Sequence, residues 1–388
     1  MIYLDNNATT RMAPEVKEAM LPWLDEFYGN PSGGYRFGKD AKKAINRARE
    51  QVAGLIGAHP EEIVFTSGGT ESNNTAIRSA IALRPERRAL LTSTVEHSAV
   101  DEVVRFFEST GYEARFNPVD SEGNLDLGVW RQSLADDAVS IASLIWANNE
   151  TGVLSPVIEA AQAAAERDVY FHSDAIQAVG KIPISVGDLP IYALSMSAHK
   201  FHGPKGIGAL YLNRNARFSP QLQGGGQENE RRSGTENVAG IVGMGVAAEA
   251  AASHLDETAN LAELRDGFEK GVMSAIEGVE INGDQKSRLP NTTSLYFPGV
   301  DGEGLLILLD EAGICCSPGS ACSTGAVQPS RIIKAMGFSS SRARSSVRFS
   351  FSRLSTQAES DEAIRAIETA VSKLRVVLSG GVTRSSAR

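Results

Sequence analysis

The apolar positions follow two alternating patterns over the first two thirds of the chain. Between Asp40 and Ile56 they recur on one helical face opposite charged residues, which predicts an amphipathic helix. Short apolar runs predict strands over residues 62–66, 89–94, 139–146, 169–172 and 191–196. Residues 140–146 are apolar nearly throughout, which is typical of a strand buried on both faces of a parallel sheet. The pattern predicts an α/β fold with a mainly parallel sheet and right-handed crossovers.

The order of elements changes after about residue 255 and becomes strand, helix, strand, helix. These four elements are predicted over residues 291–297, 304–312, 346–352 and 361–374. They suit a smaller α+β domain. We therefore predict a large α/β domain over residues 13–255 and a small α+β domain formed by residues 1–12 and 256–388. The small, polar and basic residues from Gly380 onward predict a frayed tail.

The stretch from Glu311 to Arg331 has no charged residue between its ends, and its apolar positions show neither a helical nor a strand periodicity. Gly, Ser, Pro and Cys dominate it, which predicts a long mobile loop with a function. It holds the three cysteines of the chain, Cys315, Cys316 and Cys322. Their spacing is not that of a zinc site, so we predict no metal ligands here. A nucleophilic thiolate is the more attractive interpretation, although many loop cysteines do nothing.

Composition narrows the class of protein and its compartment. The 388 residues include 38 Lys and Arg against 47 Asp and Glu, a formal net charge of −9. This acidic balance argues against nucleic acid as a partner and against a polybasic membrane anchor. No apolar run approaches the roughly 18 residues that cross a bilayer, and the N-terminal residues do not resemble a signal peptide. Three crowded cysteines cannot form a disulfide framework, so we predict a protein of the reducing cytoplasm.

A glycine-rich segment, Thr66–Asn74, follows the first of the listed strands and begins a predicted helix. Glycines let the backbone approach an anion closely, and a helix N-terminus offers unpaired N–H groups. The segment lacks the ending of a P-loop and the full dinucleotide fingerprint, which argues against a nucleoside triphosphate or NAD. A site for a single phosphate group and an ordinary strand-to-helix turn both remain open.

Two further clusters follow predicted strands. Ser195–Gly206 holds two lysines and two histidines at the carboxyl end of a strand, where ligand crevices of open α/β sheets lie. A lysine beside apolar surface becomes a competent nucleophile towards an aldehyde, but a basic surface turn is the alternative. Asp174 is placed to hold a heterocyclic nitrogen protonated, with Gln177 one helical turn further on. An aspartate that merely caps a helix fits the same pattern.

Polar residues also follow the remaining strands, at Glu96–His97 and Asn148–Gly152. Each cluster alone is weak evidence of a binding site. Polar clusters at five strand ends, however, imply one cleft that all of them line. In the strand near the C-terminus, Arg348 alternates with Val347 and Phe349 and therefore faces the other way. Arg348 either clamps a substrate carboxylate with two parallel hydrogen bonds or is a solvated edge residue.

Taken together, these residues resemble the cysteine desulfurases of the NifS/IscS-like class, which are fold-type I pyridoxal-phosphate enzymes of the class V aminotransferase family. The resemblance runs from Tyr3–Thr10 to Arg348–Ser350, nearly the whole chain. Its most specific pieces are Ser197–Gly206, Arg232–Asn237 and Gly319–Cys322. It implies a large domain that binds pyridoxal 5'-phosphate and a smaller domain that carries the cysteine loop.

The resemblance also implies roles for single residues. Lys200 would bond covalently to the cofactor, His97 would stack on its ring and move protons, and Cys322 would attack the substrate sulfur. The attack would leave a persulfide on Cys322 and release alanine. Arg348 and Asn149 would bind the carboxylate of the substrate L-cysteine.

The other cofactor contacts follow from the same resemblance. Asp174 would pair with the pyridine nitrogen and Gln177 with the phenolic oxygen. The full set of implied cofactor contacts is Gly69, Thr70, His97, Asn149, Asp174, Gln177, Ser197, His199, Lys200 and Thr235. Thr235 would reach the site from the second subunit of a homodimer.

The implied function is conversion of L-cysteine to L-alanine, with sulfur supplied to iron–sulfur cluster assembly or to other acceptors. The implied partner is a sulfur-accepting scaffold protein of unknown identity, and Cys322 could contact an iron–sulfur cluster transiently. The nearest alternative is a selenocysteine lyase or another fold-type I enzyme such as an aminotransferase. A catalytically silent sulfur-carrier or thiol-redox module is the alternative from a different class.

Overall fold

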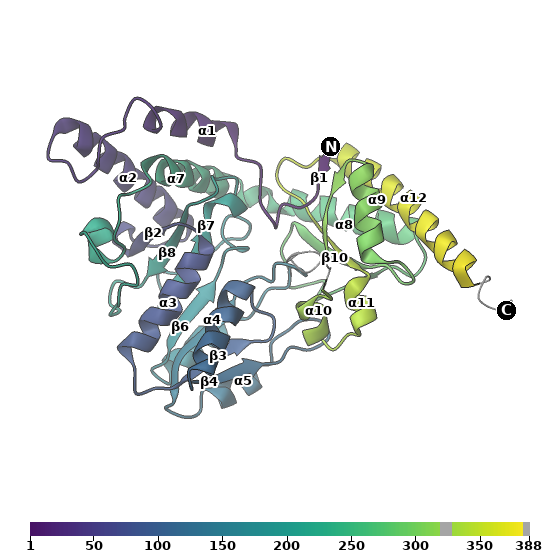
Figure 1. Cartoon of the computed structure of the whole chain (residues 1–388), viewed down its shortest axis with the longest axis horizontal. Coiled ribbons are helices and arrows are strands. Elements are labelled where there is room, and N and C mark those ends of the chain that lie inside the picture. The colour runs from purple at the N-terminus through teal and green to yellow at the C-terminus, as the bar shows by residue number, and fades with distance from the viewer. Residues whose placement is uncertain (319–327, 383–388) are drawn as a thin grey trace.

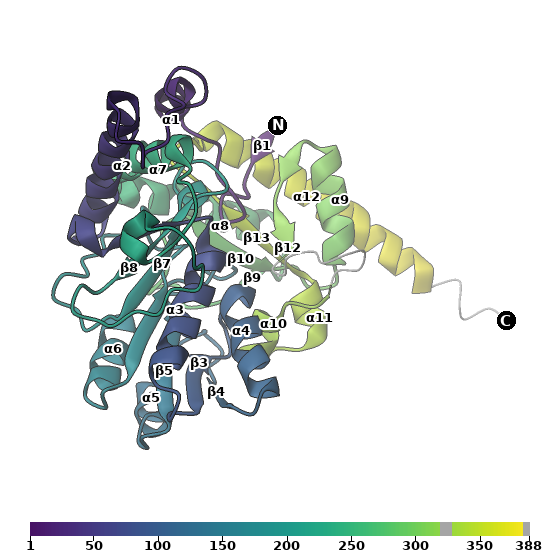
Figure 2. The same ribbon diagram turned by 60° about the vertical axis from the view of Figure 1, so that its left-hand side comes forward.

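The computed structural model describes residues 1–318 and 328–382. It consists of a larger body around a seven-stranded sheet and a smaller body around a four-stranded sheet. Figure 1 shows the two bodies side by side, with the N-terminal strand in the smaller one, and Figure 2 shows the helices that cover the larger sheet.

The large sheet has the strand order β2-β8-β7-β6-β5-β3-β4. All of its neighbours pair in parallel except β8, which is antiparallel to both β2 and β7. The strands are β2 (Ile63–Thr66), β3 (Ala89–Ser93), β4 (Glu113–Asn117), β5 (Val139–Ile145), β6 (Tyr170–Asp174), β7 (Ala193–Ser197) and β8 (Gly208–Leu212). Every residue of β5 is buried, as expected of a central strand covered on both faces. The predicted α/β fold class is confirmed.

Helices cover both faces of this sheet (Figure 2). They are α1 (Pro14–Met20), α2 (Arg36–Leu55), α3 (Gly69–Leu83), α4 (Ser98–Ser109), α5 (Leu127–Ser133), α6 (Val157–Ala165) and α7 (Val238–Ser253). The helix predicted over residues 40–56 is the main part of α2, whose buried positions Ala41, Ile45 and Ala48 recur at helical spacing. That buried stripe faces the core, where α2 packs against α7.

The smaller body holds an antiparallel sheet in the order β12-β13-β10-β9. Its strands are β9 (Glu280–Ile281), β10 (Thr292–Tyr296), β12 (Ser317–Pro318) and β13 (Ser346–Ser350). Its helices are α8 (Thr258–Ala275), α9 (Gly302–Glu311), α10 (Arg331–Ala335), α11 (Ser340–Arg344) and α12 (Gln357–Val382). The four elements predicted after residue 255 correspond to β10, α9, β13 and α12, so that prediction is confirmed.

The N-terminal segment joins the two bodies. Strand β1 (Ile2–Tyr3) pairs in parallel with β11 (Ile314–Cys315), and Leu4 is buried in the core of the smaller body. Ala13, at the start of α1, already belongs to the core of the larger body. The domain boundaries at residues 12 and 255 stay a prediction, which this division of the cores supports.

The prediction between Glu311 and Arg331 was partly wrong. The structure places the short strands β11 and β12 there, each two residues long and paired with a distant strand. Two residues are too few to show a periodicity, so no pattern of apolar positions predicts these strands. Residues 319–327, including Cys322 and most of the expected loop, lie outside the described residues.

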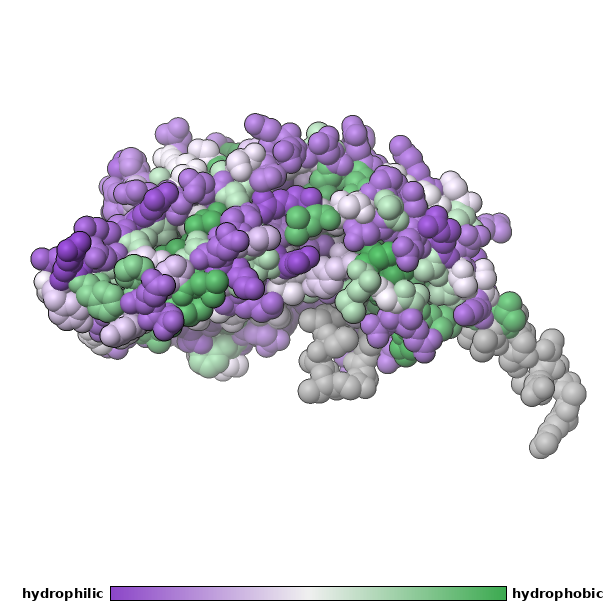
Figure 3. Space-filling model, turned by 90° about the horizontal axis from the view of Figure 1, so that it is seen from above, coloured by the Kyte–Doolittle hydropathy of each residue, from purple (hydrophilic) through white to green (hydrophobic). Residues whose placement is uncertain are grey.

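The face shown in Figure 3 is mostly polar, with smaller apolar patches between the polar residues. Within the ranges that the structure describes, no single helix is both long and apolar enough to span a membrane. One bent pair, Val238–Ser253 with Leu255–Ala275, passes the same test of length and composition.

Candidate active site

A cavity of about 410 Å³ opens at the carboxyl edge of the large sheet, between the two bodies. Residues from β-strand ends, from the N-terminal segment and from the small sheet line it together. The predicted site residues that it gathers are Gly69, Thr70, His97, Asn149, Asp174, Gln177, Ser197, His199, Lys200 and Arg348. The polar clusters that follow β2, β3, β5, β6 and β7 therefore meet in one cleft.

The glycine-rich segment forms one end of this cavity, at the N-terminus of α3. The first N–H groups of a helix have no intrahelical partner and favour an anion. A Cβ atom on Gly69 would overlap the side chain of Ile176, which also lines the cavity, so a larger residue here would displace part of the cavity wall. Ser197 and His199 line the same cavity. This cradle fits a phosphate group.

Asp174 ends β6 and lines the cavity with 2% of its surface exposed. Its Oδ2 atom accepts a hydrogen bond of 2.7 Å from Asn73, and its Oδ1 atom accepts one of 3.1 Å from the backbone N–H of Ile176. Gln177 lies in a turn rather than in a helix, which corrects the expected helical spacing. Asp174 therefore caps no helix and offers a carboxylate to the cleft.

Glu96 is a second buried carboxyl group near this site, and we assigned it no role from the sequence. Its Oε1 atom accepts hydrogen bonds from Ser93 (2.6 Å) and from the backbone of Ile145 (3.0 Å), whereas Oε2 has no partner. Burial, and secondarily the charge of Asp174, raise the pKa of Glu96 to about 8. Glu96 is therefore mostly protonated at neutral pH.

His97 and His199 are neutral side chains of the cavity wall. His97 caps α4, because its Nδ1 atom accepts a 3.1 Å hydrogen bond from the N–H of Ala99. Burial lowers the pKa of His97, against the opposing charge of Asp174. Burial, followed by the charge of Lys200, lowers the pKa of His199 to about 4. A neutral imidazole can accept a proton from a substrate.

Lys200 lies in the 3₁₀ turn Ala198–Lys200 directly after β7. Its Nζ atom donates to the backbone carbonyls of Asn7 (2.6 Å) and Ala8 (2.8 Å). Burial, then the charge of Arg348, lower the pKa of Lys200 to about 8. The amine is therefore far more often neutral at physiological pH than an exposed lysine, which suits a nucleophile towards an aldehyde.

Arg348 is buried, with 5% of its surface exposed, so it is not a solvated edge residue. Its Nη2 atom forms a 2.7 Å ion pair with Asp5, and its Nη1 atom donates to the carbonyl of Asn149 at 2.8 Å. Its Nε atom is buried without a hydrogen-bond partner. An arginine that lines a cavity with an unpaired donor fits an incoming carboxylate.

One predicted site residue lies outside this cavity and another cannot be placed. Thr235 is exposed and lines a separate hollow of about 190 Å³ near Arg232, which forms a 2.9 Å ion pair with Glu71 on α3. Cys322 lies outside the described residues. Within the described ranges, no group of three or more His, Cys, Asp or Glu side chains is placed to hold a metal ion.

Asn7 is the main site residue to which the sequence interpretation gave no role. Its carbonyl accepts from both Lys200 (2.6 Å) and Gln177 (2.9 Å), and its side chain donates to Thr292 at 2.8 Å. The run of three polar residues at positions 5–7, between Leu4 and Ala8, was the available signal. Its partners are far along the chain, so no local pattern predicts the contact.

Comparisons with known proteins agree with this geometry. A family model described as aminotransferase class-V matches residues 2–362. A cysteine desulfurase of Enterobacter agglomerans is 48% identical over 377 residues, which are 97% of this chain and 94% of the relative. A solved NifS-like protein has a TM-score of 0.90 at 36% identity, covering 96% of this chain and 100% of that one. A structure described as SspA in complex with cysteine has a TM-score of 0.81 at 33% identity, covering 92% and 100%.

Proposed function

The chain belongs to the class-V aminotransferase family, and from this premise we propose that it is a cysteine desulfurase. It converts L-cysteine to L-alanine and transfers the sulfur to Cys322 as a persulfide. The observation that carries the proposal is the single cavity that is lined by Lys200, Asp174 and Arg348 together. The likeness to a structure solved with cysteine supports the choice of substrate.

The cavity suits pyridoxal 5'-phosphate as the cofactor. The N-terminus of α3 at Gly69 and Thr70, together with Ser197 and His199, would hold the phosphate, and Asp174 would hold a proton on the pyridine nitrogen. Gln177 would donate to the phenolic oxygen. When bound through Lys200, the cofactor supplies an electron sink for the carbon that loses a proton.

The protein's own residues then bind and deprotonate the substrate. Arg348 binds the carboxylate of L-cysteine, with Asn149 beside it. Once the amine of the substrate replaces Lys200 on the cofactor, the freed amine of Lys200 would accept the proton from the substrate Cα atom, since its lowered pKa favours the neutral form. His97 would take the proton of the substrate thiol. The thiolate of Cys322 would then attack that sulfur: the S–S bond forms as the Cβ–S bond breaks, and the electron pair of the broken bond stays on the substrate carbon, which gains a proton to give L-alanine.

The products distinguish this function from the alternatives. With L-cysteine and no other amino acid, we expect equal amounts of L-alanine and of enzyme-bound or released sulfur. An aminotransferase would form a 2-oxo acid only with a second substrate, and a silent sulfur-carrier module would form no alanine. A selenocysteine lyase would act on selenocysteine and leave cysteine unchanged. Absence of alanine from cofactor-loaded protein would refute the proposal.

A sulfur-accepting scaffold protein of iron–sulfur cluster assembly, or another acceptor, completes the proposed function. The outer sulfur of the persulfide on Cys322 must pass to an acceptor, which is a thiol or a nascent cluster. A thiolate nucleophile also requires a reducing compartment, so we place the enzyme in the cytoplasm.

We further propose a homodimer in which Thr235 completes the partner's site. Thr235 is exposed and lies outside the active-site cavity of its own subunit, so its side chain is available to contact another subunit. Sedimentation should show a dimer at assay concentration, with an obligate interface of more than about 2,000 Å². An active monomer would contradict this proposal.

A subunit-mixing experiment tests the shared site more directly. Lys200→Ala and Thr235→Arg each inactivate a homodimer, but a mixed dimer has one site with both defects and one with neither. Refolding an equal mixture should restore activity to about a quarter of wild type. If each subunit's site is complete in itself, the mixture stays inactive or shows only the average activity of the two single variants.

A further inference from the structure

Lys181 is a buried lysine beside the active site that the mechanism above does not use. Only 8% of its surface is exposed, and no acidic side chain among the described residues forms an ion pair with it. Burial lowers its pKa well below the usual value, and the charges of Lys200 and Arg348 act in the same direction. A methionine of similar length would fill this place at lower cost, so packing alone does not explain a lysine here.

Its hydrogen bonds go to two amide oxygens. The Nζ atom donates to the Oε1 atom of Gln177 at 2.6 Å and to the Oδ1 atom of Asn7 at 2.9 Å. The Nε2 atom of Gln177 in turn donates to the carbonyl of Asn7 at 2.9 Å, the same carbonyl that accepts from Lys200. Lys181, Gln177 and Asn7 thus form a closed ring of hydrogen bonds that touches the amine of Lys200.

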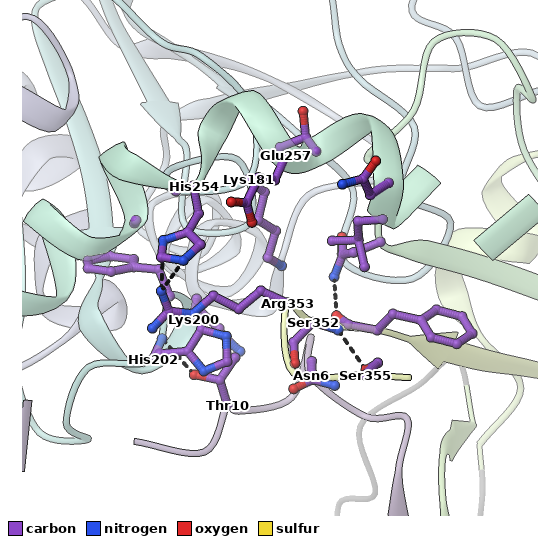
Figure 4. Close-up of a pocket in the computed structure, with 18 of the residues that line it drawn as sticks. Asn6, Thr10, Lys181, Lys200, His202, His254, Glu257, Ser352, Arg353 and Ser355 are labelled. Carbon is purple, nitrogen blue, oxygen red and sulfur yellow. Dashed lines mark hydrogen bonds between the residues drawn. The ribbon is translucent and has the colours of Figure 1, made fainter. Parts of the chain in front are cut away.

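This ring fixes which way the amide of Gln177 faces. The Nζ atom of Lys181 donates to the amide oxygen of Gln177 and the backbone carbonyl of Asn7 can only accept, so the oxygen of Gln177 faces Lys181 and its nitrogen faces Asn7. One N–H of that nitrogen is used by Asn7 and the second is left for an acceptor in the cleft. Gln177 lines the active cavity, whereas Lys181 lines a second cavity of about 240 Å³ behind it. Figure 4 shows this second cavity, with both Lys181 and Lys200 on its wall.

We propose that Lys181 is a positioning residue that holds the amide of Gln177 with its N–H donor towards the cofactor. The inference rests on the proposed function, since it assumes that Gln177 donates to the phenolic oxygen of the cofactor. It predicts that Lys181 acts through Gln177 and makes no contact with the cofactor itself.

The test is a double-mutant cycle on cofactor binding, which needs no turnover. Lys181→Met and Gln177→Leu should each weaken binding of pyridoxal 5'-phosphate by about 10-fold and shift the absorption maximum of the bound cofactor in the same direction. The double variant should bind no more weakly than Gln177→Leu alone, because the two residues act as one unit. Lys205→Met, which changes an exposed lysine, is the matched control and should leave both readouts unchanged.

Each outcome decides the inference. If the losses in affinity multiply, or if Lys181→Met weakens binding without shifting the absorption maximum, Lys181 has only a structural role and the proposal is wrong. If Lys181→Met is insoluble, Lys181→Ala takes its place in the same cycle and decides the same question. A wild-type protein that binds the cofactor but forms no alanine would refute the proposed function and leave this inference standing.

Discussion

Lys200→Ala is expected to lower desulfurase activity by more than about 10³-fold, because it removes both the covalent attachment of the cofactor and the base for the substrate Cα proton. Borohydride reduction of the wild-type enzyme, followed by peptide mapping, should place the pyridoxyl group on Lys200. Lys181 does not line the active cavity and its Nζ atom is held by Gln177 and Asn7, so it should carry no label.

The lowered pKa of the Lys200 amine predicts that the rate of cofactor loading depends on pH. The neutral form is the nucleophile, and the pKa of Lys200 is lowered to about 8, so the neutral fraction grows as pH rises through that value. Stopped-flow loading of cofactor-free protein should therefore accelerate with pH and level off above about 8. Lys205→Ala should load normally. A label on Lys181 or Lys205, or loading that still rises steeply at pH 10, would show that the amine is wrongly assigned.

Cys322→Ala is expected to keep its cofactor and to bind L-cysteine, yet to release sulfur at less than about a hundredth of the wild-type rate. The change removes the acceptor of the substrate sulfur and alters none of the described residues that line the cavity. Absorption spectra should show normal binding of the cofactor and of cysteine, and a sulfide assay should show the loss. The wild-type rate should rise with pH towards the thiol pKa, near 8.5 for a free cysteine.

The two neighbouring cysteines provide the control for this prediction. Cys316 packs against the core of the smaller body, and burial raises the pKa of its thiol well above the usual value, so it stays protonated and is a poor nucleophile. The double variant Cys315→Ser, Cys316→Ser should therefore keep most of the activity. If that variant were inactive while Cys322→Ala still released sulfide, the nucleophile would be one of the other two cysteines.

The sequence predicted the elements with strong periodicity and the site residues that follow them. The buried strand β5 and the amphipathic helix α2 have clear patterns, and Asp174 and Lys200 directly follow or end such strands. The sequence interpretation missed β4 and β8. In β4, an exposed and three half-buried residues weaken the apolar pattern.

Contacts between distant segments were beyond the reach of any local pattern. The side chain of Asn7 meets Lys181, and its backbone meets Lys200, only because the N-terminal segment crosses between the two bodies. In the sequence alone, Lys181 cannot be distinguished from an ordinary polar residue of a turn. Its role emerges only when its two amide partners are seen.

The pairing of β1 with β11 has a consequence for biosynthesis. Ile2 and Tyr3 leave the ribosome first, but their partners Ile314 and Cys315 emerge more than 300 residues later. At about 5–20 residues per second, the N-terminal segment waits on the order of tens of seconds for its partner strand, while the large sheet is already able to form. The carbonyls of Asn7 and Ala8, which accept hydrogen bonds from Lys200, belong to this N-terminal segment. The nascent chain thus completes this cleft only near the end of synthesis, when β13 with Arg348 has also emerged.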